Sequence, residues 1–442
     1  MKIRHCLLSV MANMLALIPM QAQENVVTLK SCLEKGLKNN YSLQIVRNEQ
    51  QIAENNATRA NAGMMPTVNL SAGYSGTLDN NNTIARGSES TSKDRNVMDH
   101  TVRAGINAEW TVFDGFKMQA NYQRLKELNL RSENQVRIAV EDFVANLTAE
   151  YYNFIQQRLR MKNLNYAVAL SKERLRIVHE RYMIGNNSRL DLQQAQVDFN
   201  ADSAQSLKQR EQLASSRIRL NQLMCDQDMS SHFLLADSVI DVDRVLDFDE
   251  LWASTLQNNA DLLEAAHNMT LAEIDLKSVK SRDFPYVKLN AGYSYSFMNY
   301  DIASTVRRHD WGADFGMTVG FKLYDGNRRR ERKNAEIEYA NTGLEQKNLR
   351  FTLYTTLADL WQAYENNKRL LELERQNLIS ARENYYIAHE RYLLGDLSGI
   401  EMREAQKSLL DADERILVAE YNTKLCEISL LQLSGNVSTY LE

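Results

Sequence analysis

Hydrophobic residues recur at helical spacing over one very long stretch, from Lys117 to Ile184, which contains neither glycine nor proline. At about 1.5 Å per residue, a helix of this length would reach roughly 100 Å. Apolar positions at steps of three and four form a heptad seam in which Ser171 fills the one polar slot. These positions are Met161, Leu164, Val168, Leu175, Val178 and Tyr182. Because the other faces carry charged and amide side chains, the helix can bury only a narrow stripe, and we expect no globular core.

The end of this helix is repeated about 210 residues later. Residues 179–185 read His-Glu-Arg-Tyr-Met-Ile-Gly, and residues 389–395 read His-Glu-Arg-Tyr-Leu-Leu-Gly. A shorter helical segment follows each copy, which predicts one helical hairpin over residues 116–224 and a second over 327–434, the latter interrupted only at Gly343. Internal repetition at this scale indicates a duplicated architecture. We therefore divide the chain into a first repeat, residues 23–246, and a second repeat, residues 247–442.

Strict alternation of apolar and polar residues precedes each hairpin and predicts two β-strands per repeat. The strands are expected at about 67–78, 101–113, 286–298 and 311–324, with a polar loop over about 79–100. Aromatic and aliphatic side chains form one face of each strand, and polar residues and glycines form the other. The polar face, which we expect to line a water-filled lumen, includes Arg103, Asn107, Glu109, Asp314, Thr318 and Lys322.

Strands of about ten residues with one apolar face have the dimensions of transmembrane β-strands. Bacterial barrels start at about eight strands, and an open edge in lipid would leave backbone groups unpaired. Four strands cannot close alone, so several copies of the chain must share one barrel. The alternative is a soluble sheet packed on the helices, for which one apolar face is also normal, although the neighbouring helices offer no broad apolar face to cover it.

The first residues are typical of a secretory signal peptide, residues 1–22, with Lys2 and Arg4 ahead of an apolar stretch that ends at Pro19. Cys6 comes too early for a lipoprotein signal, so we expect no lipid anchor. Cys32, Cys225 and Cys426 lack paired spacing and are interpreted as buried small hydrophobic residues rather than as a disulfide framework or zinc site. The net charge of -5, with basic and acidic residues interleaved, argues against a nucleic-acid partner.

The order of these elements resembles TolC-type outer-membrane efflux channels, the outer membrane factor family. The motifs that carry the resemblance are Phe113-Asp114-Gly115, Tyr324-Asp325-Gly326, and residues 182–185 followed by Leu-Asp-Leu-Gln-Gln-Ala-Gln at 190–196. The resemblance implies a mainly α protein with a transmembrane β part. Three copies would form one 12-stranded barrel in the outer membrane of a Gram-negative bacterium, continued by a 12-helix tunnel across the periplasm.

The resemblance also implies functional residues at the ends of the hairpins. The tips that would dock a periplasmic adaptor comprise Tyr182, Gly185, Leu190, Tyr392 and Gly395. An acidic ring that narrows the tunnel corresponds to Glu401 and Glu404, and a latch that holds it closed corresponds to Asp191 and Tyr392, with Leu397 where relatives place a linking arginine. Two other interpretations stay open: the glycines can be simple helix C-caps, and acids are favoured in the first turns of any helix.

The implied function is a passive exit duct for drugs or other small molecules, served by the adaptor and by an inner-membrane pump of the RND (proton-driven) or ABC (ATP-driven) type, in contact with outer-membrane lipid. Type I protein secretion and a periplasmic coiled-coil adaptor are the alternatives. We expect no enzymatic activity, cofactor or metal, because Met183 and Leu393 stand where a zinc protease would have its second histidine. The basic run at residues 328–333 could attract anionic lipid or substrate, but a solvated helix face is the simpler interpretation.

Overall fold

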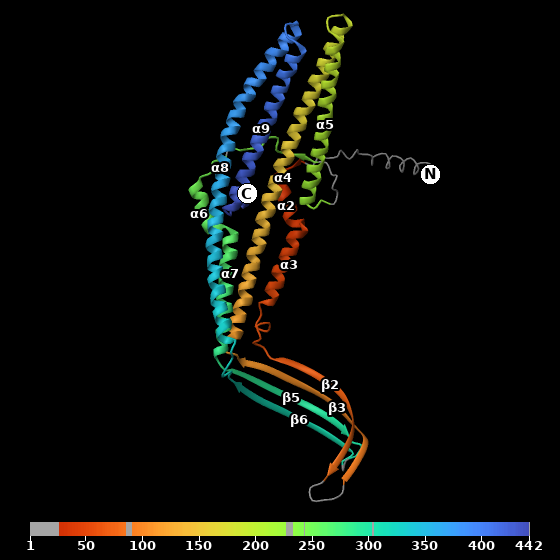
Figure 1. The fold of residues 1–442 in the computed structure, drawn as a ribbon, viewed down its shortest axis with the longest axis vertical. Coiled ribbons are helices and arrows are strands. Elements are labelled where there is room, and N and C mark those ends of the chain that lie inside the picture. The colour runs from red at the N-terminus through yellow and green to blue at the C-terminus, as the bar shows by residue number, and fades with distance from the viewer. Residues whose placement is uncertain (1–25, 85–90, 227–232, 243, 303–304, 442) are drawn as a thin grey trace, which may run out of the picture. The chain divides into compact units, whose positions relative to one another are not determined.

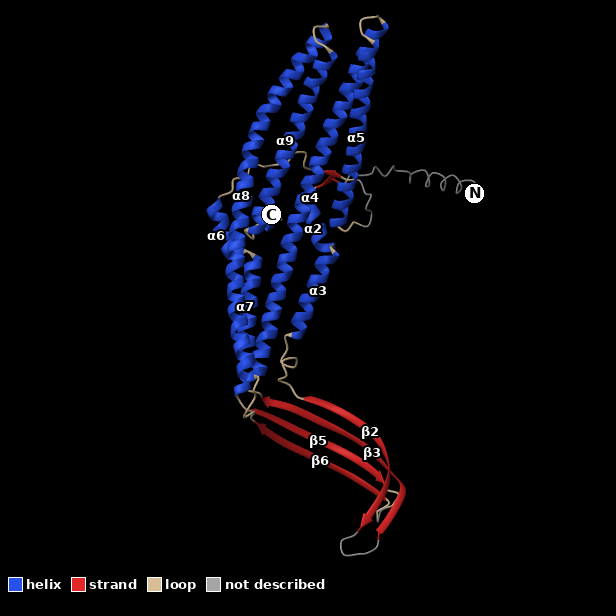
Figure 2. Cartoon of the chain, viewed as in Figure 1, coloured by secondary structure: helices blue, strands red, loops and turns tan. Residues whose placement is uncertain are grey.

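The structure of the protein is a computed structural model that describes residues 26–84, 91–226, 233–242, 244–302 and 305–441. The predicted signal peptide lies outside the described residues. Helices dominate, and four long strands form the main sheet (Figures 1 and 2). In chain order the elements are β1 (Val26–Val27), α2 (Leu29–Asn39), α3 (Tyr41–Asn56), β2 (Thr67–Ile84), β3 (Thr91–Phe113), α4 (Lys117–Met183), α5 (Arg189–Leu223), β4 (Leu234–Leu235), α6 (Phe248–Asn258), α7 (Ala260–Lys280), η1 (Ser281–Asp283), β5 (Tyr286–Asn299), β6 (Arg307–Gly320), α8 (Arg328–Leu394), α9 (Gly399–Leu433) and η2 (Val437–Tyr440).

The chain divides into two compact units, and each unit draws on both halves of the sequence. The first unit comprises Met1–Gln44, Ile138–Asn259 and Thr352–Glu442, and the second comprises Ile45–Arg137 and Ala260–Phe351. The helices α4 and α8 each run through parts of both units. The sequence repeats 23–246 and 247–442 therefore describe a duplication and not the compact units, and the division into repeats stays a prediction.

The second unit contains one antiparallel sheet in the order β2-β3-β5-β6, so each predicted repeat contributes one hairpin (Figure 1). The predicted loop over 79–100 is too long, because β2 continues to Ile84 and β3 begins at Thr91. Polar residues can extend a ladder because backbone groups make its hydrogen bonds. The strand β6 ends at Gly320 rather than 324, because Gly320 faces Tyr286, the first residue of β5 after Pro285.

The register of the sheet separates polar and apolar side chains onto opposite faces, as the alternation predicts. On the polar face, Asn107 lies opposite Gly292, which lies opposite Asp314. A Cβ at Gly292 would come within 2.6 Å of side-chain oxygens of both neighbours. On the apolar face, Leu70 and Phe315 are 80% and 89% exposed. A sheet packed on helices through this face would bury such residues, and here they are open to the surroundings.

The long helices α4 and α8 contain 67 residues each, close to the predicted lengths. The helix α8 continues through Gly343, so the predicted interruption is wrong; a Cβ there would meet no neighbouring atom within 4 Å. In the second half of α4 the buried stripe follows Ala167, Ser171, Arg174 and Val178, slightly rotated from the predicted seam. Among the helices of the described ranges, none combines the length and the apolarity that crossing a membrane requires.

The expectation that the chain has no globular core is wrong. In the first unit, the middle of α4 packs with α2, α9 and the β1–β4 pair around side chains that are completely buried, including Leu33, Leu147, Tyr151 and Ile155. The predicted seam began only at Met161, whereas the apolar residues of α4 around Tyr151 occupy more than one helix face. The short helix α2 and the β1–β4 pair therefore pack on a broad apolar surface of α4.

The interpretation of the cysteines as small buried side chains is confirmed at two of the three positions. Cys32 and Cys426 are buried, and Cys225 is half-buried; all three are free thiols. Burial raises the pKa of the Cys32 thiol to about 12. Because thiolate is the reactive form, Cys32 is chemically inert in this fold.

The two Asp-Gly motifs lead to a testable difference in stability. Gly115 has φ +77°, and a Cβ would lie 2.2 Å from the carbonyl oxygen of Ser281. Gly326 lies outside the positive-φ region, and its Cβ would meet nothing closer than the hydroxyl of Tyr324 at 3.5 Å. We expect Gly115→Ala to lower the free energy of unfolding by about 2 kcal/mol or more and Gly326→Ala to change it by less than about 0.5 kcal/mol. Thermal unfolding of the two purified variants measures this, and equal losses would contradict it.

Candidate functional site

The predicted docking tips are two short turns at the same end of the first unit (Figure 1). Gly185 and Gly395 have φ values of +82° and +88°, and a Cβ on either would meet no atom within 4 Å. Their backbone N–H groups donate to the carbonyls of Tyr182 and Tyr392 at 3.0 and 3.2 Å. Both glycines are therefore helix C-caps in the left-handed conformation. The open space beside them also leaves room for a partner, so the docking role stays a prediction.

The helices that leave the two tips begin with the same capping box. Ser188 and Ser398 are the N-caps of α5 and α9, and the third helical residues, Asp191 and Glu401, bond back to them. The carboxylate of Glu401 accepts hydrogen bonds from the backbone N–H and hydroxyl of Ser398, at 3.0 and 2.8 Å, which lower its pKa. Helix capping explains why an acidic residue stands at both positions. In an acidic ring, Glu401 would have to keep its hydrogen bonds to Ser398.

Glu404, the other predicted gate residue, has a different environment. It is exposed and lines a cavity of about 340 Å³ between α4, α5 and α9. The cavity is also lined by Arg174, Asp198 and Arg403. Of the two predicted gate acids, Glu404 is therefore the one whose carboxylate takes no part in the capping box.

The structure does not join the two predicted latch residues by a hydrogen bond. The carboxylate of Asp191 bonds the backbone N–H and hydroxyl of Ser188 at 3.0 and 2.8 Å. Tyr392 is only 3% exposed, and its hydroxyl has no hydrogen-bond partner among the described residues. Burial raises the pKa of Tyr392, against the lowering effect of Arg181 and Arg174. Tyr392 therefore acts in this protomer as a packed ring.

Arg181 links the two tips instead. Its guanidinium donates to the carbonyl oxygens of Tyr392 and Leu393 at 2.9 and 3.1 Å, and it lies 4.9 Å from the Tyr392 ring centroid. The last carbonyls of a helix attract cations, so Arg181 of the first hairpin caps the long helix of the second. The arginine of the repeated His-Glu-Arg-Tyr motif is the sequence signal for this contact, although the motif alone does not name its partner.

A second connection between the hairpins is a buried ion cluster formed by Arg174, Asp198, Asp202 and Arg403. Arg403 on α9 binds both carboxylate oxygens of Asp202 on α5 at 2.7 Å. Arg174 on α4 pairs with Asp198, and Ser171 donates to Asp202. Arg174 and Asp202 are only 5% and 6% exposed. No single motif in the sequence marks these partners, and of the residues in these contacts only Ser171 belongs to the predicted seam.

The charges of this cluster depend on one another. Burial lowers the pKa of Arg174, while the neighbouring Asp198 raises it. The hydrogen bonds that Arg403 donates to the carboxylate of Asp202 raise the pKa of Arg403, against the effect of burial. Since charges removed from water need well-placed partners, the two arginines and two aspartates stabilise one defined arrangement of α4, α5 and α9.

Five of the six predicted lumen residues lie within the strands of the sheet, on its polar face: Arg103, Asn107, Glu109, Asp314 and Thr318. Lys322 comes after β6 and pairs with Asp325 at 2.8 Å. Its ammonium group therefore stabilises the turn that leads into α8. The sheet presents a continuous polar surface, whose role as a lumen stays a prediction.

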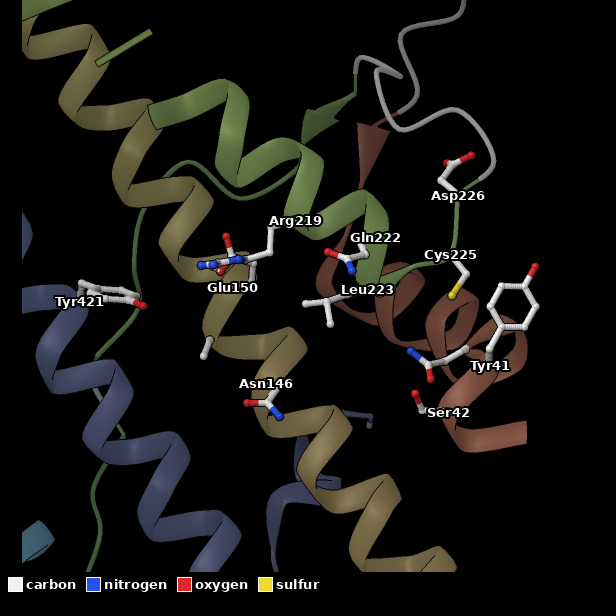
Figure 3. Close-up of a pocket in the computed structure, with 12 residues that line it drawn as sticks. Tyr41, Ser42, Asn146, Glu150, Arg219, Gln222, Leu223, Cys225, Asp226 and Tyr421 are labelled. Atoms are coloured by element: carbon white, nitrogen blue, oxygen red, sulfur yellow. Dashed lines mark ion pairs between the residues drawn. The ribbon is translucent and has the colours of Figure 1, made fainter. Parts of the chain in front are cut away.

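A cavity of about 770 Å³ in the first unit lies where the start of α3, the middle of α4 and the end of α5 meet (Figure 3). Glu150 is held there by Ser216 at 2.8 Å, with Arg219 at 3.8 Å. Cys225 also lines the cavity. Among the described residues that line it, there is no histidine.

The basic run at residues 328–333 forms the first residues of α8, and its side chains differ in their partners. Arg328 and Arg332 turn toward Asp283 at 3.3 and 3.9 Å, and Glu331 pairs with Arg282. Two of the five basic side chains of the run are thus engaged in ion pairs. Among the described residues, no group of three or more histidine, cysteine or acidic side chains is arranged to hold a metal ion.

Comparison with known proteins now decides the family. The family model described as "Outer membrane efflux protein" matches residues 32–225 and 251–436, which is most of the chain. The chain belongs to the outer membrane efflux protein family. Membership places the protein in the outer membrane and assigns it to efflux. The two matched segments each contain one of the hairpins that the sequence analysis identified as copies.

Individual relatives are distant in sequence and similar over nearly their whole length. The outer membrane protein TolC of Vibrio cholerae is 21% identical over 91% of this chain and 89% of its own. The cation efflux system protein CusC of Escherichia coli is 21% identical over 92% of this chain and 86% of its own. The crystal structure of VceC from Vibrio cholerae superposes with a TM-score of 0.74 at 15% identity, covering 92% and 96% of the two chains. The fold is therefore that of a TolC-like channel.

The buried ion cluster predicts an asymmetric response to loss of arginine. Arg403→Gln would leave the carboxylate of Asp202 buried with Ser171 as its remaining close donor. We expect it to cost about 3 kcal/mol in the free energy of unfolding. Arg176→Gln is the matched control, because Arg176 forms ion pairs with Glu173 and Glu180 on the exposed face of α4; its loss should lower stability much less, because solvent screens exposed ion pairs. Thermal unfolding compares them, and similar shifts would refute the role of burial.

Proposed function

We propose that three copies of this chain form a passive duct across the outer membrane, with four strands from each copy closing a 12-stranded barrel. The observation that carries the proposal is the sheet. Its apolar face is exposed, and β2 and β6 are edge strands in this chain. In lipid, an unpaired strand edge costs several kcal/mol per backbone group. Pairing β6 of one copy with β2 of the next would satisfy both edges at once.

The long hairpins support a tunnel that continues from the barrel into the periplasm. Each copy supplies α4, α5, α8 and α9, so three copies would supply a ring of 12 helices. The polar face of the sheet, with Asn107 and Asp314 beside Gly292, suits a water-filled lumen. We assign no chemical step to the protein: energy for transport would come from an inner-membrane pump through a periplasmic adaptor that binds the tips.

We further propose that the periplasmic end is closed by Glu404 and by the contacts between the hairpins. Three copies would bring three Glu404 carboxylates around one axis, where mutual repulsion and attraction of cations control passage. Arg181 and the ion cluster hold the two hairpins of one copy together. Opening the tunnel by moving one hairpin would require these buried contacts to exchange partners. Glu401 contributes less, because its carboxylate is already bound to Ser398.

The cargo is best described as small molecules or ions. CusC, which matches this chain over 86% of its own length, is named a cation efflux system protein, and this supports ionic cargo. A polar lumen shared by several pumps selects little, so specificity would belong to the inner-membrane partner. Protein secretion is the alternative; a gene for an ATP-driven exporter beside this one would favour it, whereas a proton-driven pump and adaptor would favour efflux of small molecules.

Conductance tests the duct and its gate together. Purified trimers in planar bilayers should conduct, and Glu404→Gln should reduce cation selectivity by about twofold or more, because it removes three charges from a narrow axis. Glu401→Gln is the control, since glutamine preserves the capping box and should leave selectivity nearly unchanged. A trimer that conducts neither as wild type nor as Arg403→Gln would contradict the duct. Equal effects of the two glutamine variants would contradict the assignment of the gate to Glu404.

The docking role of the tips is tested by separating strain from bulk. Gly395→Asn should retain export, because asparagine adopts positive φ at low cost. Gly395→Phe should abolish export while leaving trimer assembly intact, since the phenyl ring fills the open space beside the tip. Drug susceptibility of cells and native gel analysis of the trimer give the two readouts. Retained export by both Gly395→Phe and Gly185→Phe would refute docking at these turns.

A further inference from the structure

The two hairpins of the sheet carry the same tyrosine–histidine pair near their helix-distal ends. In the first hairpin the hydroxyl of Tyr74 lies 2.6 Å from Nδ1 of His100. In the second hairpin the hydroxyl of Tyr295 lies 2.7 Å from Nδ1 of His309. Each bond joins two adjacent strands and fixes the imidazole ring through Nδ1. The Nε2 atom of each histidine is not used by the tyrosine and remains available to another group.

The register places both histidines and one arginine together on the apolar face. His100 lies opposite Asn299, and Asn299 lies opposite Arg307, so the three belong to one row across β3, β5 and β6. His309 belongs to the next row on the same face, opposite Phe297. Trp311, 69% exposed, follows His309 on this face. We name His100, Arg307 and His309 the distal basic patch.

The position of the patch corresponds to the edge of a membrane. Nine residue steps separate Thr67 from Gly76, which lies opposite His100. Nine steps are about 30 Å of strand, and a tilt near 45° reduces this to about 21 Å of height, against an apolar band about 25 Å tall in outer-membrane barrels. Aromatic residues below basic residues, at that height, are typical of the interface between acyl chains and headgroups.

The acidic side chains that the structure describes in this region have other partners than the patch. Asp310 pairs with Arg308 at 2.9 Å, and both belong to the polar face. Asp99 also belongs to the polar face and accepts from the backbone N–H of Asp301, whose own carboxylate accepts from the backbone of Met98. Among the described residues, no ion pair of Arg307 is found within 4 Å, and Arg307 and His309 are both exposed. Within the described part of the chain, Arg307 and the two imidazole rings thus have no carboxylate partner.

We infer that the distal basic patch binds the phosphate of a lipid in the outer leaflet, one patch in each copy of the chain. The inference rests on the proposed barrel, which turns this face toward lipid. Arg307 would form a bidentate contact with phosphate oxygens, and the Nε2 atoms of His100 and His309 would donate to the same group. Trp311 and Tyr295 would contact the lipid below its phosphate. Basic residues at a membrane surface each contribute about a fivefold gain in affinity for anionic lipid.

The test is a lipid titration of the intact trimer followed by native mass spectrometry. The probes are diphosphorylated lipid A and phosphatidylcholine. The triple variant His100→Gln/Arg307→Gln/His309→Gln should bind lipid A about fivefold or more weakly than wild type, with unchanged binding of phosphatidylcholine. Arg308→Gln is the matched control, because it removes a neighbouring arginine from the opposite face. Equal affinities of wild type and the triple variant would overturn the inference, as would an equal loss in Arg308→Gln.

Two further measurements keep the result interpretable. If the triple variant does not assemble, Tyr74→Phe/Tyr295→Phe replaces it, since it only releases the imidazole rings; it should weaken lipid A binding by about twofold, and no change would count against the patch. Inorganic phosphate that displaces lipid A at equal concentration would indicate a site for a free anion and would also overturn the inference. Conductance of the same trimers tests the duct separately, so loss of lipid binding with normal conductance identifies failure of this inference alone.

Discussion

The unpaired edges of the four-stranded sheet are the constraint on which the rest of the architecture depends. Within one chain, β2 and β6 each have a neighbour on one side only. In the proposed barrel, the backbone N–H and C=O groups at such edges would face lipid, where only another strand supplies a continuous series of partners. The two prolines near the sheet follow the same logic: Pro66 and Pro285 precede the first residues of β2 and β5, where no ladder donor is lost.

The two copies have the same backbone conformations at their helix ends but differ in their side-chain contacts. Both copies end their long helix at a glycine with positive φ and restart with a serine and an acid in a capping box. The arginines of the repeated motif differ, however: Arg181 reaches the opposite hairpin, whereas Arg391 contacts the carbonyl of Asp396 within its own tip. Local geometry recurs because the backbone permits few ways to end a helix. The side-chain contacts between the hairpins are under no such constraint, so they differ between the two halves of the chain.

Buried charge is used twice in the first unit, with different consequences. Lys424 and Glu427 form an ion pair at 3.0 Å inside the core, where the hydroxyl of Tyr440 also bonds Glu427 at 2.9 Å and fastens the C-terminal segment. The ion cluster around Arg403 instead joins helices of different hairpins. A buried charge pair contributes little net stability but strongly disfavours separation of its partners. The first pair therefore suits a permanent core, and the second suits a contact that resists opening.

The sequence by itself determined the four long strands, the two long helical hairpins and their order. Strict alternation identified all four strands, the absence of glycine and proline identified α4, and the repeated motif located both tips. These features depend on residues close in the chain, so a local pattern reports them. The polar face of the sheet was predictable for the same reason, because a period of two assigns every residue of a strand to one face.

Tertiary structure alone decided which faces meet. The core around Tyr151 and the pairing of Asp202 with Arg403, which are 201 residues apart, have no local signature. Periodicity shows that a residue lies on a buried face but not which partner covers it. The predicted latch is an example. The sequence allowed Asp191 to pair with Tyr392, but in the structure the carboxylate of Asp191 accepts a hydrogen bond from the hydroxyl of Ser188, three residues earlier in the chain. Only the packed helices reveal that Arg181 and Arg403 connect the hairpins, because those contacts exist only after distant segments have been brought together.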